Sequence, residues 1–294
     1  MVIDSYVHPL CYGPLYDEET FEYWEREYGM GLMGPMEYDE IFAEMDWGGV
    51  DMNFLMPLDV TTISGGYFAT NDDTARLAAE HPERFVNFAS VDPSREDAAD
   101  ELERAFTELG AKGLHLHPGK QRVMATDRKL EPLFELCERY DRPVYFDAGL
   151  SWEPSCPMRY THPLAIEEAI MDHPNIRFAL AHFAWPWVRE MVALMLKYPN
   201  VYTDCSVLYL DSPEESIERL FTHDMGPMWF ERSFAGQVML ASNTPRFRCF
   251  KIKRSVERLG LPEDALEAIL GGNALAFLGE KGAAEVLAAA GKGE

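Results

Sequence analysis

The chain has 294 residues, of which 47% are hydrophobic and 12% aromatic, which is enough for a large core in one domain or two. Its formal charge of −24, from 26 basic and 50 acidic residues, repels phosphate backbones and argues against nucleic acid as a partner. No run of about 18 apolar residues occurs, so we expect no membrane-spanning helix and no membrane partner.

Short apolar runs alternate with amphipathic stretches along the whole chain. Strands are predicted at residues 2–3, 51–56, 85–91, 112–117, 144–147, 176–182, 201–204 and 238–242. Helices are predicted between them at residues 73–80, 95–109, 130–140, 164–171, 187–197 and 213–221. This alternation is typical of βα units and predicts one α/β domain over residues 1–294, a closed (β/α)8 TIM barrel. An open doubly wound sheet is the alternative, although no GxGxxG motif follows the first strand.

Residues 10–35 interrupt this rhythm with an insertion rich in aromatic and acidic side chains. Its aromatic residues are Tyr12, Tyr16, Phe21, Tyr23, Trp24 and Tyr28. An insertion after a barrel strand lies on the active-site face, so it is interpreted as a lid. A small packing subdomain or a contact in a homodimer remains the alternative. Residues 282–294, rich in Ala and Gly, are predicted to form a last helix that frays.

Polar side chains stand where the predicted strands end. In a parallel barrel all these ends face one mouth, so residues distant in sequence converge there. They form the candidate site: Tyr6, His8, His115, His117, Asp147, His182, Asp204 and Asn243.

His115 and His117 are two residues apart on a strand, so their side chains share one face. Two imidazoles in this position could chelate a divalent ion. Alternatively, one orients a substrate and the other hydrogen-bonds a neighbour. The spacing alone leaves both interpretations open.

Several motifs, in this order and spacing, resemble those of one known family. Residues 3–9 (IDSYVHP) are similar to its I-D-x-H-x-H-P opening, and residues 113–118 (GLHLHP) to its G-[LIV]-K-L-H-P segment. Residues 143–149 (PVYFDAG), 181–183 (AHF) and 242–245 (SNTP) stand where it has P-V-x-[IF]-H-x-G, A-H-[LF] and S-D-[YTF]-P. The chain thus resembles the amidohydrolase-related family, in the branch of aminocarboxymuconate-semialdehyde decarboxylase, aromatic-acid decarboxylases and pyrone-dicarboxylate lactonase.

The resemblance implies a metal site that this chain has altered. Metal-dependent members hold one divalent ion at four positions, which here are Tyr6, His8, Asp147 and Asn243. Of these, only His8 is the standard ligand, whereas His182 matches the family's catalytic histidine. One interpretation keeps a Zn or Mn ion in a rebuilt site, with His8, Asp147, His182 and His117 as ligands. The other is chemistry without a metal, which is favoured because three of the four positions differ.

The resulting functional hypothesis is a hydrolase for a small cyclic or aromatic substrate that can carry a carboxylate. Asp147 and His182 would be the general acid and base, with His115 or His117 stabilising negative charge. The alternatives are a metal-dependent nonoxidative decarboxylase of an aromatic or muconate-like acid, and a barrel that binds a small molecule without catalysis.

Aromatic, basic and amide side chains near the strand ends are predicted to contact the substrate. They are Tyr6, Trp152, Trp185, Trp187, Asn243 and Arg246. Further candidates for binding a carboxylate are Lys120, Arg122, Arg159 and Arg248. The five scattered cysteines and the absence of a signal-like N-terminus favour a cytoplasmic protein.

Overall fold

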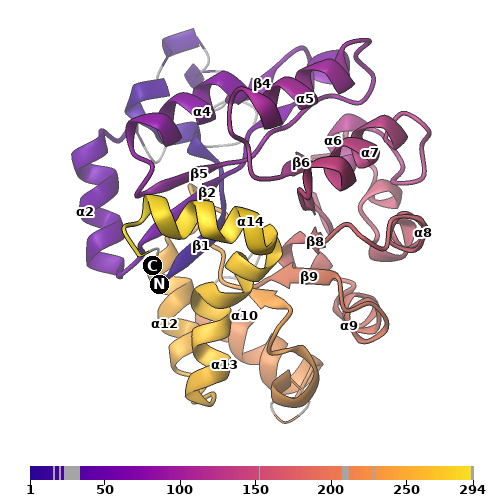
Figure 1. Cartoon of the computed structure of the whole chain (residues 1–294). Helices are drawn as coiled ribbons and strands as arrows, with labels where there is room; N and C mark the ends of the chain where they lie inside the picture. The colour runs from indigo at the N-terminus through magenta and orange to yellow at the C-terminus, as the bar shows by residue number, and fades with distance from the viewer. Residues whose placement is uncertain are drawn as a thin grey trace.

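A computed structural model describes residues 1–15, 17–19, 21–22, 34–151, 153–206, 212–226, 228 and 230–292. Eight parallel strands form the centre of the molecule (Figure 1). They are β1 (Ile3–Val7), β2 (Met52–Leu55), β5 (Phe85–Asn87), β6 (Leu114–Leu116), β7 (Val144–Phe146), β8 (Phe178–Leu180), β9 (Val201–Asp204) and β10 (Val238–Met239). Each lies within or overlaps one of the predicted strands.

The strands close into a ring. Ladders join β1 to β2 and β5, and β6 through β10 in sequence order. A parallel bridge between Ala89 and Leu114 connects the two ladders on one side. On the other side the Ser5 amide donates to the Leu240 carbonyl at 2.9 Å. The (β/α)8 barrel is therefore confirmed, and the open-sheet alternative is wrong.

Helices surround the ring, and all six predicted helices are present with shifted ends. In chain order the helices are α2 (Tyr38–Gly48), α3 (Thr61–Ser64), α4 (Asn71–Glu80), α5 (Ala98–Thr107), α6 (Pro118–Gln121), α7 (Glu131–Tyr140), α8 (Glu167–Asp172), α9 (Val188–Lys197), α10 (Pro213–Arg219), α12 (Cys249–Glu257), α13 (Glu263–Glu267) and α14 (Asn273–Ala289). No helix in the described part of the chain is long and apolar enough to cross a membrane.

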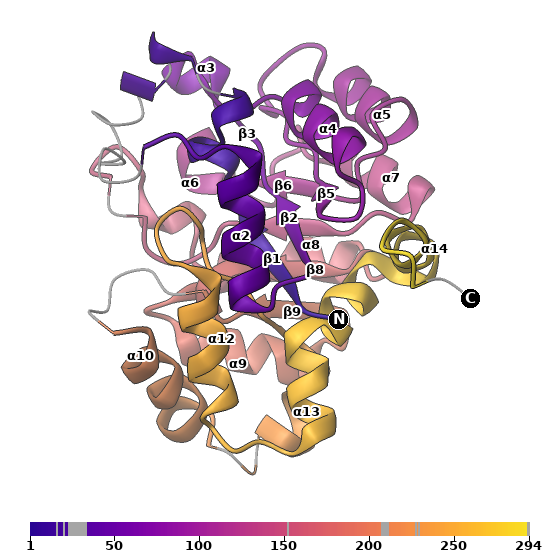
Figure 2. The ribbon, with the colours of Figure 1, turned by 90° about the vertical axis from the view of Figure 1, so that its left-hand side faces the viewer.

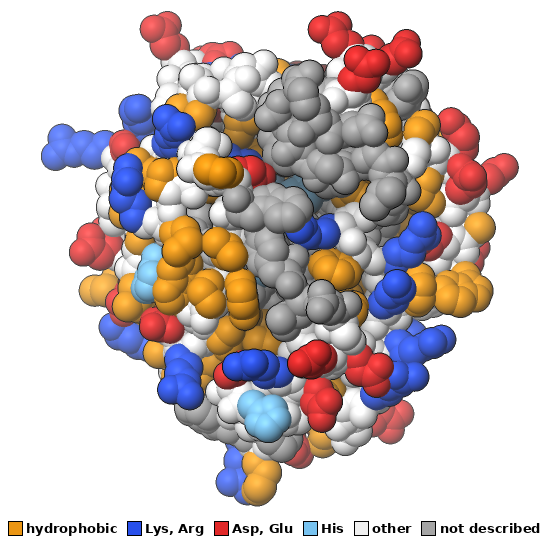
Figure 3. All heavy atoms as spheres, turned by 180° about the vertical axis from the view of Figure 1, so that it is seen from behind, with side chains coloured by type: hydrophobic (Ala, Val, Ile, Leu, Met, Phe, Trp, Pro, Cys, Tyr) orange, Lys and Arg blue, Asp and Glu red, His pale blue; other side chains and the backbone are white. Residues whose placement is uncertain are grey.

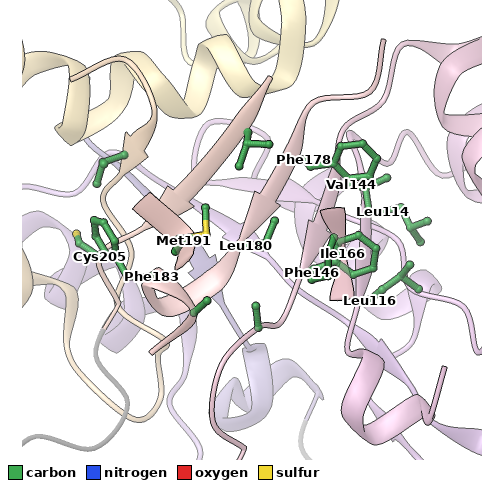
Figure 4. Close-up of a cluster of buried hydrophobic side chains, with 14 of the residues drawn as sticks. Leu114, Leu116, Val144, Phe146, Ile166, Phe178, Leu180, Phe183, Met191 and Cys205 are labelled. Atoms are coloured by element: carbon green, nitrogen blue, oxygen red, sulfur yellow. The ribbon is translucent and has the colours of Figure 1, made fainter. Parts of the chain in front are cut away.

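Alternation along the strands creates two hydrophobic layers. Phe146, Phe178 and Leu180 face outward, where Figure 4 shows them packed with Ile166 and Met191. The intervening residues face the barrel interior, where they form a second cluster that includes Tyr6, Phe54, Phe88, Tyr145 and Ala179. His115 lies between outward-facing Leu114 and Leu116, so this two-residue period turns its ring into the barrel.

The two ends of the barrel differ. Helix α14 lies across the end where β1 begins (Figure 1), and Phe277, Leu278 and Val286 of this helix join the interior cluster. Residues 282–289, predicted as part of a fraying tail, continue α14. The carboxyl ends of the strands point to the opposite side, as Figure 2 shows from the side, so the loops after the strands form the face that carries the polar residues.

Two backbone hydrogen bonds close the base of the 10–35 insertion. The Gly13 amide donates to the Met36 carbonyl and the Met36 amide to the Cys11 carbonyl, both at 2.7 Å. Phe21 packs against a cluster that includes Leu58 and Phe68 from the short antiparallel pair β3 (Leu58–Asp59) and β4 (Tyr67–Phe68), which was not predicted. Tyr16, Tyr23, Trp24 and Tyr28 of the predicted lid lie outside the described residues.

Gly149 allows the loop after β7 to approach the loop after β8. Its φ is +90°, and a Cβ atom there would lie 2.4 Å from the Trp185 carbonyl oxygen. Gly149→Ala should therefore lower the free energy of unfolding by at least about 2 kcal/mol, because both the backbone conformation and the contact oppose a side chain. Urea unfolding measures this. A Gly149→Ala variant as stable as the wild type would show that the two loops separate without cost. The control is Gly236→Ala, because a Cβ atom at Gly236 meets nothing within 4 Å.

Candidate active site

The Asp147 carboxylate forms the centre of the candidate site. It follows β7, is buried, and lies 2.8 Å from the hydroxyl of Tyr6, which donates to its Oδ2. The Nε2 atom of His117 lies 3.6 Å from Oδ1, and the Nε2 atom of His182 lies 3.7 Å from Oδ2. The predicted convergence of Asp147, His117 and His182 is present in the structure.

The second ring nitrogen of each histidine fixes its tautomer. Ser206 donates its hydroxyl to Asp204, so it accepts from His182 Nδ1 at 2.5 Å. Neutral His182 therefore carries its proton on Nδ1 and directs a lone pair from Nε2 towards Asp147. In His117 the Lys120 amide donates to Nδ1 at 3.3 Å, so the proton of the neutral ring is on Nε2. One imidazole thus presents an acceptor to the site, and the other presents a donor.

His115 and His8 are held by consecutive backbone carbonyls that follow β2. His115 Nδ1 lies 2.6 Å from the Pro57 oxygen, and His8 Nδ1 lies 3.0 Å from the Met56 oxygen. Because a carbonyl only accepts, each Nδ1 carries a proton. His115 Nε2 then lies 3.0 Å from the Tyr6 oxygen, where it competes with Asp147 for the Tyr6 proton.

Two residues that were predicted to contact the substrate are fully buried. Tyr6 was predicted to bind substrate, but it is fully buried, and its hydroxyl is engaged by Asp147 and His115. His115 was predicted to act on substrate, but its ring lies behind Tyr6 with both nitrogens engaged. Strand alternation placed these rings in the barrel correctly, but it could not indicate their depth. Tyr6 binds Asp147 directly, and His115 is linked to Asp147 through the Tyr6 hydroxyl.

Burial and charge set the protonation states of these groups. Burial alone would raise the pKa of the Asp147 carboxyl, but the imidazoles of His117 and His182 and the Tyr6 hydrogen bond outweigh it and hold that pKa well below its usual range. Burial lowers the pKa of His117 to about 4 and that of His8 to about 3. Burial and the Asp147 charge hold the pKa of Tyr6 well above its ordinary value. At neutral pH the centre therefore contains the Asp147 carboxylate and the neutral rings of His8 and His117.

We expect the buried neutral His117 to destabilise the protein in acid. Its folded pKa of about 4 lies below the ordinary 6.5, so the unfolded chain binds a proton in this window and the folded chain does not. The contribution of neutral His117 to the free energy of unfolding is present above pH 6.5. It is lost as the pH falls towards 4, by about 2 kcal/mol at pH 5. Asp147, Lys120, Glu153 and His115 all act on this ring.

The effect is isolated by comparing wild type with His117→Gln in urea unfolding at pH 7 and pH 5. Asp4, whose pKa burial raises to about 6, acts in the opposite direction, but it is common to both proteins. The wild type should lose more stability between the two pH values than the variant. Equal losses would mean that the folded protein protonates His117 readily.

The backbone at two strand ends is held in unusual conformations. His182, Phe183 and Ala184 have φ values of +61°, +48° and +48°, and Asn243 has +60°. Left-handed conformations cost roughly 1–2 kcal/mol per residue for most side chains, and such residues cluster at functional sites. The hydrogen bond from the His182 amide to Asp204 at 3.2 Å helps to hold the first of them.

The ligand set predicted for a divalent ion is not assembled. In the described part of the chain no three side chains of His, Cys, Asp or Glu are placed to hold one ion together. The Tyr6 hydroxyl stands beside Asp147 where the resemblance implies an imidazole, and the neutral amide of Asn243 replaces a carboxylate. The residues present therefore do not fit a Zn or Mn ion bound in the manner of the family.

Figure 3 shows the molecule from the side opposite to that of Figure 1, where α14 lies in front. The remaining predicted substrate contacts that the structure describes follow β8 and β10 in the chain. Trp187 packs against His162 with ring centroids 4.5 Å apart, and Trp185 packs against the outer core. Asn243 and Arg246 are half-buried and joined by a backbone hydrogen bond of 2.9 Å. Trp152 lies outside the described residues.

Three residues of this site were missed at the sequence level. Ser206 connects His182 to Asp204, and Tyr145 donates to the other Asp204 oxygen at 2.7 Å. Gln121 accepts from the His117 amide at 3.0 Å and donates to the carbonyls of Asp59 and Val91 at 2.9 and 3.0 Å. A hydroxyl or amide near a strand end has no distinctive spacing, so only the fold identifies these residues.

Relatives of known structure share this fold. An uncharacterized TIM-barrel protein from Bordetella bronchiseptica is 23% identical, with a TM-score of 0.74 and coverage of 99% of both chains. The 5-carboxyvanillate decarboxylase of Sphingomonas paucimobilis is 18% identical, with a TM-score of 0.64 over 94% of this chain and 98% of that one. At these identities the likeness concerns the fold.

Sequence relationships go further. A 2-amino-3-carboxymuconate-6-semialdehyde decarboxylase of Dictyostelium discoideum is 26% identical over 238 residues, which are 71% of this chain but only 65% of that relative. The sequence model of the amidohydrolase family matches residues 3–279, nearly the whole barrel. The chain therefore belongs to the amidohydrolase family.

Proposed function

We propose that this enzyme hydrolyses a small cyclic or aromatic ester or lactone that carries a carboxylate, by acid/base catalysis without a bound metal. The observation that carries the proposal is the placement of His117 and His182 beside the two carboxylate oxygens of Asp147, with Nδ1 partners that assign opposite tautomers to the two rings. His182 directs an acceptor to the site and His117 directs a donor, and Asp147 lies within 4 Å of both. Such a pair can remove a proton from water and stabilise an oxyanion without further groups.

The steps follow from these positions. His182 Nε2 takes a proton from water as the water oxygen forms a bond to the substrate carbonyl carbon. The ionised Asp147 stabilises the imidazolium that forms, and the Nε2–H of His117 donates to the oxyanion. The carbon–oxygen bond to the leaving group then breaks, and the leaving oxygen takes the proton from His182. Ser206 and Asp204 keep the His182 ring in the tautomer that begins this cycle.

A second candidate is nonoxidative decarboxylation, because several proteins similar to this chain are decarboxylases. Besides the decarboxylases described above, a 2,6-dihydroxybenzoate decarboxylase from Rhizobium shares the fold, with a TM-score of 0.65 at 15% identity over 96% of this chain and 99% of that one. This candidate is the metal-dependent alternative, in which a divalent ion would hold the departing carboxylate.

Product analysis separates the two candidates. The purified enzyme is assayed with carboxylated lactones and with hydroxylated benzoic acids, and ring-opened acid and carbon dioxide are both quantified. We expect ring opening with one proton released per turnover and no carbon dioxide. Stoichiometric carbon dioxide from a benzoic acid would establish the second candidate instead.

A further inference from the structure

Lys120 is the basic residue that the fold places beside the catalytic centre. It lies in α6, which begins directly after His117, and its backbone amide binds the His117 ring. Its ammonium lies 5.5 Å from the centre of the Phe68 ring, which in turn lies 6.1 Å from the His8 ring. Its charge also acts on His117, whose pKa it lowers after the larger effect of burial.

Three other candidate cations, Arg122, Arg159 and Arg248, are engaged elsewhere. Arg248 pairs with Glu44 of α2, and the Arg159 guanidinium lies 4.4 Å above the Tyr160 ring. Arg122 donates to the Ser155 carbonyl at 3.4 Å. Of these four basic residues, Lys120 is the one whose backbone amide binds the His117 ring.

Lys120 forms an ion pair with Glu153, from the loop that follows Asp147. Both side chains are largely buried, with 13% and 19% of their surface exposed. Ser151 also donates to Glu153. Burial alone would raise the pKa of Glu153, but Lys120 and Ser151 hold it below its usual value, so the carboxyl is ionised at neutral pH.

A largely buried ion pair of this kind favours one class of incoming molecule. Removing one partner leaves a charge with poor solvation, which is costly. A molecule that brings its own carboxylate can replace Glu153 beside Lys120, while Glu153 turns to water. A neutral molecule offers no such replacement, so the pair resists its entry.

We infer that Lys120 determines specificity for a carboxylated substrate and that Glu153 occupies the carboxylate position until that substrate displaces it. The inference rests on the proposed function for its substrate class. It adds Lys120 as the residue that binds the substrate carboxylate and Glu153 as the residue that competes with that carboxylate. Glu153 therefore weakens the binding of a carboxylated substrate in the wild type.

The test is binding of benzoate, with neutral benzamide as the comparison, measured by titration calorimetry. Lys120→Met should raise the dissociation constant of benzoate about tenfold, because a charge-assisted contact is lost. Glu153→Gln should lower it about threefold, because the internal competitor is gone. The dissociation constant of benzamide should not show these opposite changes in the two variants. The matched control is Lys112→Met, which breaks a comparable pair with Glu285 at the opposite end of β6.

Opposite effects of the two substitutions support the inference, because a purely structural ion pair would make both variants bind worse. Weaker benzoate binding in both variants, or no change in either, would overturn it. Thermal melting of each variant shows whether it folds, and Lys120→Arg provides a second variant that keeps the charge. Binding needs no turnover, so a failure of the proposed hydrolysis would be seen in product analysis and not here.

Discussion

Asp147→Asn should reduce turnover on the order of 10³-fold while the protein keeps its fold, because the charge that stabilises protonated His182 is lost. The amide has the shape of the carboxylate and can still accept from Tyr6, whose hydroxyl lies 2.8 Å away. The loss should therefore appear in kcat, with a smaller change in KM. Steady-state kinetics on the substrate found by product analysis measures this.

Asp92→Asn is the control for Asp147→Asn. Asp92 is fully buried and accepts from the amides of Thr62 and Ser94 at 2.9 and 3.0 Å, but these contacts lie in the neighbouring loops. If Asp92→Asn folds, it should retain most of its kcat. Near wild-type turnover in Asp147→Asn would show that the charge of this carboxylate has no part in the reaction.

His182→Gln should reduce turnover by about 10²–10⁴-fold, since glutamine can fill the space but cannot take a proton from water. Ser206→Ala should give a smaller loss in the same parameter, because Ser206 binds His182 Nδ1 at 2.5 Å and fixes the tautomer rather than moving the proton. The exposed His223→Gln is the matched control and should be indistinguishable from wild type.

The relative size of these two losses distinguishes the role of His182 from that of Ser206. If Ser206→Ala were more damaging than His182→Gln at equal thermal stability, the roles of the two residues would have to be exchanged. If Asp147→Asn, His182→Gln and Ser206→Ala all kept wild-type turnover, the catalytic site would lie elsewhere at the mouth of the barrel.

The barrel could be predicted because its signal is repeated. Each βα unit contributes a short apolar run and an amphipathic stretch, so errors of a few residues at the ends do not change the topology. The pair β3 and β4 has two residues in each strand, which is too short for a periodic pattern to indicate it. The convergence of Asp147, His117 and His182 followed from the barrel alone, since strand ends meet at one mouth.

The depth and pairing of the side chains could not be predicted. Tyr6 and His115 stand at positions that the sequence places in the mouth, but they point inward far enough to be fully buried. The tautomers of His182 and His117 depend on Ser206 and on the Lys120 amide, and neither contact has a spacing that a sequence pattern records. These contacts therefore depend on the folded structure and have no sequence signal of their own.

The central claim is acid/base catalysis at Asp147 and His182 without a resident metal, and metal content measured together with activity tests it most directly. The purified enzyme is analysed for bound metals by mass spectrometry, and its turnover is compared before and after dialysis against a chelator. We predict substoichiometric metal and an unchanged rate. One tightly bound ion per chain, with turnover lost on chelation and restored by Zn or Mn, would contradict the claim.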